Sequence, residues 1–369
     1  MRLILSSSDF LVSGISYEGI PILINNQGNV VEPALDFFIS NILRNARSSD
    51  KKTWESYGKH LYDYFGFLEA RSLDWQYIPA EDSGEIPPLS HYVNWCQKIG
   101  NMASYVNDKT GIIKRFYRWA YERKLIDALP FYSTGNTYWG EQTNVDLKEP
   151  KSLIHVLTRS QANTILNAPI NPTHHTALNL FLSAGLRAEE VTTLPLSYVK
   201  NLANHPRGKP YNLPLSPRDM ALKNNKARTV SIPYSCMDSL WRYAAVIRPT
   251  LEQRSNKKNE ALFLTRYGLP FEADGFNTPC SRLSKKLGFH IHPHLLRHTF
   301  ASHLYVALED LNRKGKLRES PILILQKQLG HSSMLTTMDY LHLIETINDE
   351  HGTKYQRELD VIANLYGQK

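Results

Sequence analysis

Apolar residues recur at helical spacing in the first third of the chain. Residues 53–70 predict an amphipathic helix, because apolar side chains return every three or four positions. They are Trp54, Tyr57, Leu61, Tyr64, Phe65 and Leu68. Residues 109–125 repeat the pattern with Ile112, Ile113, Phe116, Tyr117 and Ala120. These patterns predict a helical domain over residues 33–126.

The polar face of the second predicted helix is basic. It carries Lys114, Arg115 and Arg118. Taken singly, such residues are typical of a solvated helix surface. As a group they are candidates for contacts with phosphates.

Residues 1–32 alternate with a different period. Ile20, Ile22 and Ile24 lie two residues apart, before a turn at Asn25–Gly28 and a second apolar run. This pattern predicts a small β-hairpin or β-extension. A structural edge is favoured over an accessory contact with DNA.

The middle of the chain separates two regions. Residues 127–152 are polar, contain Pro130 and Pro150 and show no sustained period. They predict an interdomain linker of about 25 residues. Beyond it, Thr158 with Gln161 three residues later predicts a capping box at the start of a helix.

The rest of the chain is mixed. Residues 153–345 combine helical runs with a β-like stretch at residues 200–233, so we expect a mainly α domain with a small antiparallel sheet, an α+β class. Residues 346–369 carry another apolar stripe, which predicts a C-terminal helix.

Length and composition support two domains and indicate the kind of partner. A chain of 369 residues with 42% apolar residues is globular and exceeds what one core usually serves. Lys and Arg number 43 against 35 Asp and Glu, a net charge of +8. This excess favours a polyanionic partner, nucleic acid before a membrane surface.

Other classes are disfavoured. The first apolar run is too short for a signal peptide and no run of about 18 apolar residues occurs, so we expect a soluble cytoplasmic protein. Cys96, Cys236 and Cys280 are far apart, so neither a disulfide framework nor a zinc site is predicted.

Two segments place basic residues where they could act on a phosphate. An apolar helix stops at Gly185 and is followed by Arg187, with Glu190 three residues later. A guanidinium oriented by a carboxylate can bind a phosphate, although an arginine here is also typical of a helix cap. Lys223 and Lys226 lie near a turn before a strand, either solvated or able to donate a proton.

Two further segments contain histidines. Residues 290–304 hold five of them, and His294 shares a helical face with Arg297. A metal site is disfavoured because this segment contains no carboxylate. Residues 329–342 hold His331 and, nine residues later, Tyr340.

These segments combine into one chemistry. Arginines that neutralise the phosphate, proton-transferring groups and a hydroxyl nucleophile suit in-line phosphoryl transfer without a metal ion. The set is Arg187, Lys223, His294, Arg297, His331 and Tyr340.

The order and spacing resemble the tyrosine recombinase (phage integrase) family. The matching motifs are Gly185-Leu186-Arg187 with Glu190, the hairpin lysine in K-x-x-K-x-R-x-V, HLLRHTFASHL, Leu329-Gly330-His331 and the tyrosine nine residues on. The likeness covers roughly residues 40–345. The stretch from Arg297 to His331 is longer than is usual in the family. Residues 309–320 within it predict a surface insertion that could contact DNA or another protomer.

The resemblance implies an activity and roles for these residues. Tyr340 would attack the DNA backbone and form a 3′-phosphotyrosyl link, with Lys223, or else Lys226, as general acid. Arg187 and Arg297 would stabilise charge, and Glu190 would orient Arg187. His294 and His331 would hydrogen-bond the phosphate oxygens or assist proton transfer. No metal, ATP or other cofactor would be needed.

The resemblance also implies an architecture and partners. A helical core-type DNA-binding domain and a catalytic domain would form a C-shaped clamp on double-stranded DNA, with Lys114, Arg115 and Arg118 as DNA contacts. The protein would assemble as a tetramer, with the C-terminal helix packed on its own domain or exchanged between protomers. It would integrate or excise a mobile element with directionality factors, as a cytoplasmic, nucleoid-associated protein of a bacterium, phage or mobile element.

Two alternatives remain open at this point. A type IB topoisomerase-like enzyme would share the nucleophile chemistry but relax DNA. A catalytically silent DNA-binding descendant would lack at least one key residue, and none is missing.

Overall fold

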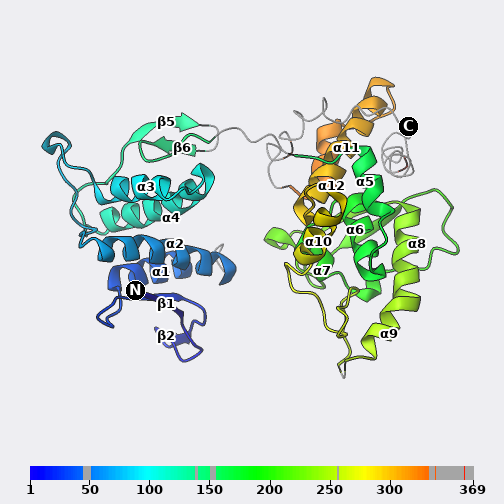
Figure 1. The fold of residues 1–369 in the computed structure, drawn as a ribbon, viewed down its shortest axis with the longest axis horizontal. Coiled ribbons are helices and arrows are strands. Elements are labelled where there is room, and N and C mark those ends of the chain that lie inside the picture. Colours follow the sequence, from blue (N-terminus) through cyan, green and yellow to red (C-terminus); the bar gives the residue numbers. More distant parts are fainter. Residues whose placement is uncertain are drawn as a thin grey trace. The chain divides into compact units, whose positions relative to one another are not determined.

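The computed structural model describes residues 1–44, 51–137, 140–149, 155–255, 257–331, Thr337 and Val361. The chain divides into two compact units, residues 1–152 and 153–369 (Figure 1). Within the described ranges helices predominate, and the strands form two-stranded antiparallel sheets. This confirms the mainly α, α+β class that the sequence predicts.

The first unit begins with paired strands. Strand β1 (Arg2–Leu5) runs antiparallel to β4 (Pro21–Ile24), and the short strands β2 (Leu11–Val12) and β3 (Ile15–Ser16) pair between them. The expected partner of β4 was the run after the turn, which forms a single bridge from Ile24 to Val30.

The turn after β4 explains this difference. The Asn25 side chain accepts hydrogen bonds from the backbone N–H groups of Gln27 and Asn29. The chain then enters helix α1 (Glu32–Arg44) almost at once, which leaves no room for a second strand. Strand β4 therefore pairs with the start of the chain.

The N-terminal strands belong to the core of the first unit. Ile20 and Leu23 are fully buried in the same apolar cluster as the helices. Gly58 of helix α2 (Lys51–Ala70) allows this approach, because a Cβ there would lie 2.6 Å from Cβ of Pro21. Residues 1–32 are thus packed against the helices that follow them.

In the described part of this unit, four helices and a short 3₁₀ turn, η1 (Glu81–Ser83), complete the fold. Helices α3 (Pro88–Lys98) and α4 (Ala103–Glu122) pack with α1 and α2. The predicted apolar stripes are confirmed, since their members other than Tyr57 are buried. The hydroxyls of Tyr64 and Tyr117 meet at 2.5 Å in the interior.

The described residues of the expected linker, 127–137 and 140–149, add structure to the first unit. Strands β5 (Ser133–Thr137) and β6 (Gly140–Thr143) pair antiparallel, and Val145 is buried in the core. The prediction missed this hairpin because its sequence has little apolar alternation.

Lys114 does not lie on the exposed basic face that its helical position suggested. Its ammonium group lies 2.5 Å from Asp146 and donates to Thr143 at 3.2 Å, and the residue is 8% exposed. Burial raises the pKa of Asp146, but hydrogen bonds from Lys114 and Thr143 outweigh burial and lower it. The prediction that Lys114 lies on an exposed basic face of the helix is therefore wrong.

The second unit begins with the predicted capping box. Thr158 accepts a hydrogen bond from the N–H of Gln161 at 3.2 Å, and Gln161 accepts one from the N–H of Thr158 at 3.0 Å. Helix α5 (Arg159–Leu166) follows directly, which confirms the prediction.

The remaining elements of this unit surround helix α6 (Pro172–Ala184). Along the described chain they are α7 (Ala188–Thr192), η2 (Leu196–Tyr198), β7 (Tyr211–Leu215), η3 (Lys223–Asn225), β8 (Arg228–Ile232), α8 (Tyr234–Arg242), the π-helical turn η4 (Tyr243–Ile247), α9 (Arg248–Glu252), α10 (Asn277–Leu287), α11 (Pro293–Arg313) and α12 (Pro321–Leu329). Strands β7 and β8 form the antiparallel hairpin.

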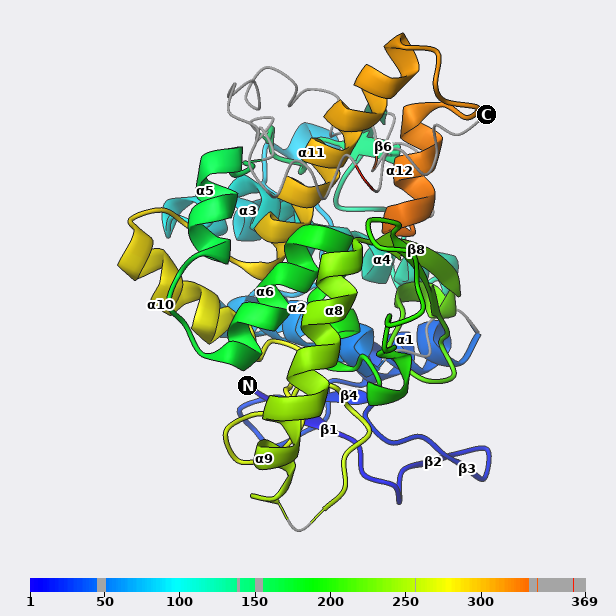
Figure 2. The ribbon, with the colours of Figure 1, turned by 90° about the vertical axis from the view of Figure 1, so that its right-hand side faces the viewer.

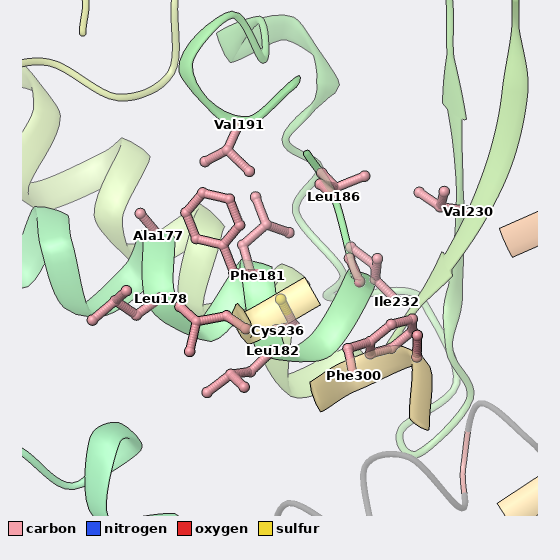
Figure 3. Packing of buried hydrophobic residues seen from close by; sticks show 14 of the residues in the cluster. Ala177, Leu178, Phe181, Leu182, Leu186, Val191, Val230, Ile232, Cys236 and Phe300 are labelled. Atoms are coloured by element: carbon pink, nitrogen blue, oxygen red, sulfur yellow. The ribbon is translucent and has the colours of Figure 1, made fainter. Parts of the chain in front are cut away.

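Helix α6 is the centre of the second core. It contacts α5, α8, α11 and β8 (Figure 2). Figure 3 shows Phe181 and Leu182 of α6 packed with Ile232 of β8 and Phe300 of α11. Two elements of this core also carry basic residues of the candidate site described below: Arg228 lies in β8 and Arg297 in α11.

The predicted insertion at residues 309–320 starts inside a helix. Helix α11 continues to Arg313, and Gly315 turns the chain at φ +67° before α12 begins at Pro321. Only the second half of the predicted segment is therefore a loop. Over the described part of the chain, every helix is too short or too polar to cross a membrane.

The ion pair of Lys114 and Asp146 predicts a stability effect. Replacing Asp146 with Ala leaves a buried ammonium group uncompensated, and we expect the free energy of unfolding to fall by about 3 kcal/mol. Glu141→Ala is the matched control, because it breaks the half-exposed pair with Arg118 and should cost less than about 1 kcal/mol. Calorimetric melting of the full chain measures both, and equal losses would contradict the prediction.

A second stability prediction concerns the end of α6. Gly185 has φ +65°, and a Cβ there would lie 2.3 Å from Cδ1 of Phe300. Gly185→Ala should destabilise the protein through backbone strain of about 1–2 kcal/mol and overpacking of about 1–3 kcal/mol. Gly288→Ala, at φ +79° with open space around it, should show the strain alone. Urea unfolding that ranks the two variants as equal would exclude the packing contribution.

Candidate active site

The turn between α6 and α7 positions Arg187. Helix α6 ends at Gly185, and Arg187 occupies the N-cap of α7. Its Nη1 donates to Glu190 at 3.1 Å and its Nη2 to the carbonyl of Gly330 at 3.3 Å. The side chain is 23% exposed, so part of the guanidinium remains accessible to a ligand.

Glu190 is an interior carboxylate with two arginine partners. It is 1% exposed, and it receives both terminal nitrogens of Arg228 at 2.7 and 2.8 Å. Burial alone would raise its pKa, but the hydrogen bonds and charge of Arg228, with the backbone N–H of Arg187, lower it to about 2. The carboxylate is therefore charged at neutral pH.

Arg228 is a site residue that was not selected from the sequence. It is the first residue of strand β8, whose last three residues are buried. The available signal was an arginine at the start of a strand with a buried end, next to the two candidate lysines. That position is also typical of a solvated hairpin, so the signal was ambiguous.

Arg297 is buried instead of facing solvent. It is 1% exposed and donates to the carbonyls of Gly185 at 2.5 Å and Leu329 at 2.7 Å. These carbonyls lie at the C-terminal ends of α6 and α12, where the helix dipole favours a cation. One guanidinium thereby joins the two turns that carry Arg187 and His331.

His331 is held as a neutral imidazole. Its Nε2 lies 3.1 Å from Nη2 of Arg297, and its Nδ1 lies 3.0 Å from Oγ1 of Thr337. Because a guanidinium only donates, Nε2 accepts and the proton is on Nδ1. Burial and then the charges of Arg297, Arg187 and Arg228 lower the pKa of His331 to about 3.

His294 and Lys223 lie in the same electrostatic environment. Burial, then the charges of Arg297, His292, Arg187 and Lys223, lower the pKa of His294. Its ring packs edge-on against His298, with centroids 4.1 Å apart.

The two candidate lysines are both exposed on the loop between β7 and β8. Lys223 lies in η3, where Asn224 and Asn225 have positive φ angles. The charge of Lys223 contributes to lowering the pKa of His294, so its amine lies within electrostatic range of that ring. The choice between Lys223 and Lys226 as general acid stays a prediction.

Tyr340 lies outside the described residues. Thr337, three residues earlier, is described and is bonded to His331. The structure thus brings Arg187, Glu190, Arg297 and His331 into one hydrogen-bonded cluster, with His294 and Lys223 near it.

The remaining basic candidates lie in the first unit. Nη1 of Arg115 donates to the hydroxyl of Tyr57 at 2.5 Å and is exposed, and Arg118 pairs with Glu141. Their contact with DNA stays a prediction. Among the residues that the structure describes, no three His, Cys, Asp or Glu side chains are grouped to hold a metal ion.

Known proteins resemble the chain over most of its length. The tyrosine recombinase XerC of Pelotomaculum thermopropionicum is 27% identical over 315 residues, covering 82% of this chain and 90% of the relative. A tyrosine recombinase XerD of Halalkalibacterium halodurans is 24% identical over 312 residues, covering 81% and 90%.

A solved structure shares the fold. The Tn1549 transposon integrase in complex with transposon right end DNA has a TM-score of 0.56 and 17% identity, covering 86% of this chain and 95% of that one. Residues 155–346, which contain the whole cluster around Glu190, match the phage integrase family. The chain therefore belongs to the phage integrase family.

Proposed function

We propose that this protein is a site-specific DNA recombinase that cleaves and rejoins DNA through a 3′-phosphotyrosyl intermediate. The observation that carries the proposal is the convergence of Arg187, Arg297 and His331 at the Gly330 turn. Such a cluster can hold an anion and stabilise charge on phosphate oxygens without a metal ion. The family and its relatives' names as tyrosine recombinases support the same chemistry.

The proposed reaction is an in-line exchange. The Tyr340 phenol oxygen attacks the scissile phosphorus, the bond to the 5′-oxygen breaks, and the phenol proton passes to solvent water. Arg187, which keeps accessible surface, binds the non-bridging oxygens. Buried Arg297 adds a second positive charge to the site and holds the turns at Gly185 and Gly330 in place through the carbonyls of Gly185 and Leu329.

Lys223 is the proposed proton donor. It protonates the 5′-oxygen, which would otherwise leave as a poor alkoxide. His331 is neutral, so it acts as a hydrogen-bonding group and does not supply this proton. Religation reverses both transfers, and therefore neither ATP nor another cofactor enters the cycle.

The biological setting is also part of the proposal. Two structural neighbours are integrases: the Tn1549 protein, in complex with transposon right end DNA, and a lambda integrase dimer, bound to a core site. We infer double-stranded DNA as the partner, a tetramer on paired sites, and integration or excision of a mobile element with accessory factors in the cytoplasm.

The nucleophile predicts a covalent complex. Incubated with a nicked suicide duplex carrying the junction of its own element, the wild type should form a protein–DNA adduct that survives denaturing electrophoresis. Tyr340→Phe should form none, because the attacking hydroxyl is gone. Tyr267→Phe, at an exposed tyrosine of the same unit, should react as the wild type does. An adduct with Tyr340→Phe would show that another residue attacks.

The two lysines predict different responses to the leaving group. Lys223→Ala should slow cleavage by about 10²-fold or more on normal DNA. On a duplex with sulfur in place of the bridging 5′-oxygen it should recover, because a thiolate leaves without a proton. Lys226→Ala should reduce the cleavage rate less on normal DNA, and the sulfur substitution should not restore its rate. The opposite pattern in single-turnover cleavage would assign the general acid to Lys226.

A further inference from the structure

Arg228 occupies the carboxylate oxygens of Glu190 that could otherwise bind both terminal nitrogens of Arg187. Both Arg228 terminal nitrogens bond the two oxygens of Glu190, at 2.8 and 2.7 Å. This is the bidentate fork that a guanidinium and a carboxylate prefer. The Arg228 side chain is 9% exposed, so the pair is shielded from water.

Arg187 has a weaker hold on the same carboxylate. One of its terminal nitrogens reaches Glu190, at 3.1 Å, and its side chain is 23% exposed. Its backbone N–H takes a further lone pair of Glu190 at 2.8 Å. With four donors on two oxygens, Glu190 has no capacity left to form a second side-chain bond to Arg187.

The second support of Arg187 also contacts Arg228. The Gly330 carbonyl accepts from Arg187 at 3.3 Å. A Cβ on Gly330 would lie 2.6 Å from Cδ and 2.9 Å from Nε of Arg228, so the Arg228 stem fills the space beside this turn. Arg228 therefore touches both groups that orient Arg187, although it does not bond Arg187 in the described contacts.

We propose that Arg228 is a positioning residue that keeps Arg187 available to the scissile phosphate by occupying the Glu190 carboxylate. The inference rests on the proposed function, because it assigns Arg187 to the phosphate. Without Arg228, Glu190 would take Arg187 as its own bidentate partner and withdraw the guanidinium from the ligand.

Arg228 also anchors the loop that carries the candidate general acid. Lys223 lies five residues before it, a tether of at most about 18 Å in extended chain. The pairing of Arg228 with Glu190 therefore fixes the end of the loop from which Lys223 reaches the DNA. One side chain thereby links the phosphate-binding arginine to the proton donor.

The test measures single-turnover covalent complex formation by the full-length protein on the suicide duplex. We expect Arg228→Gln to lower the rate at neutral pH at least about tenfold. Arg228→Lys, which keeps the charge but cannot form the fork, should fall between it and the wild type. Arg242→Gln removes an exposed arginine that pairs with Asp238 and should leave the rate unchanged.

Restoration by a second substitution separates positioning from a structural role. Glu190→Gln added to Arg228→Gln removes the negative charge that would capture Arg187, and we expect it to recover severalfold of the lost rate. A purely structural Arg228 predicts a further loss, since another buried interaction disappears. Calorimetric melting of each variant shows whether rate and stability change together.

The pH dependence gives an independent readout. The cations that face Glu190 and hold its pKa low are Arg228, Arg187 and Arg297. Loss of Arg228 should raise that pKa, so protonation of Glu190 would release Arg187 to the phosphate at a higher pH than in the wild type. The rate deficit of Arg228→Gln relative to the wild type should therefore shrink as the pH falls. The double variant, which lacks the carboxylate, should not show this recovery at acid pH.

The outcomes separate the two proposals. A wild type that forms no covalent complex overturns the proposed function and this inference with it. A reactive wild type with an unaffected Arg228→Gln overturns the inference alone. So does a rate loss that is independent of pH and is not relieved by Glu190→Gln. If Arg228→Gln fails to fold, the same criteria apply to Arg228→Lys and its double variant.

Discussion

A charged carboxylate inside the second unit determines how the chain is arranged around it. Removing an ion from water is strongly unfavourable unless hydrogen bonds and opposite charge replace the lost hydration. Glu190 obtains both from Arg187 and Arg228, which lie on opposite sides of it in the sequence. The start of α7 and the start of β8 must therefore lie together. Without this constraint, the hairpin bearing Lys223 would have no fixed base beneath the phosphate-binding arginine.

Two glycines make the arrangement sterically possible. Gly185 and Gly330 each end a helix at positive φ, and a side chain at either would collide with a neighbour, Phe300 or Arg228. Both turns also direct helix-end carbonyls toward Arg297. The short motifs that contain these glycines thus have a stereochemical role: they let helix ends, aromatic packing and guanidinium groups meet within a few ångströms.

Local patterns in the sequence predicted local structure well and long-range pairing poorly. Periodicity predicted helices α2 and α4, and the capping box at Thr158 is present as expected. The pairing of β4 with β1 and the burial of Lys114 depend on partners that no local pattern identifies. Arg228, the arginine of the K-x-x-K-x-R-x-V motif, was left out of the candidate site for the same reason, because its role depends on a carboxylate 38 residues away. The motifs did select residues that meet around Glu190. Two of these motifs lie at the glycine turns that end α6 and α12, and the motif with Arg297 lies in the first turns of α11.

The resting site has more positive than negative charge. Arg187, Arg228 and Arg297 surround one carboxylate, with the exposed amine of Lys223 close to them. Free of DNA, such a site attracts any small anion, and multivalent ones most strongly. Sulfate and phosphate in the medium are therefore competitors for the substrate as well as screening ions, and the choice of buffer salt should change apparent DNA affinity beyond what ionic strength alone explains.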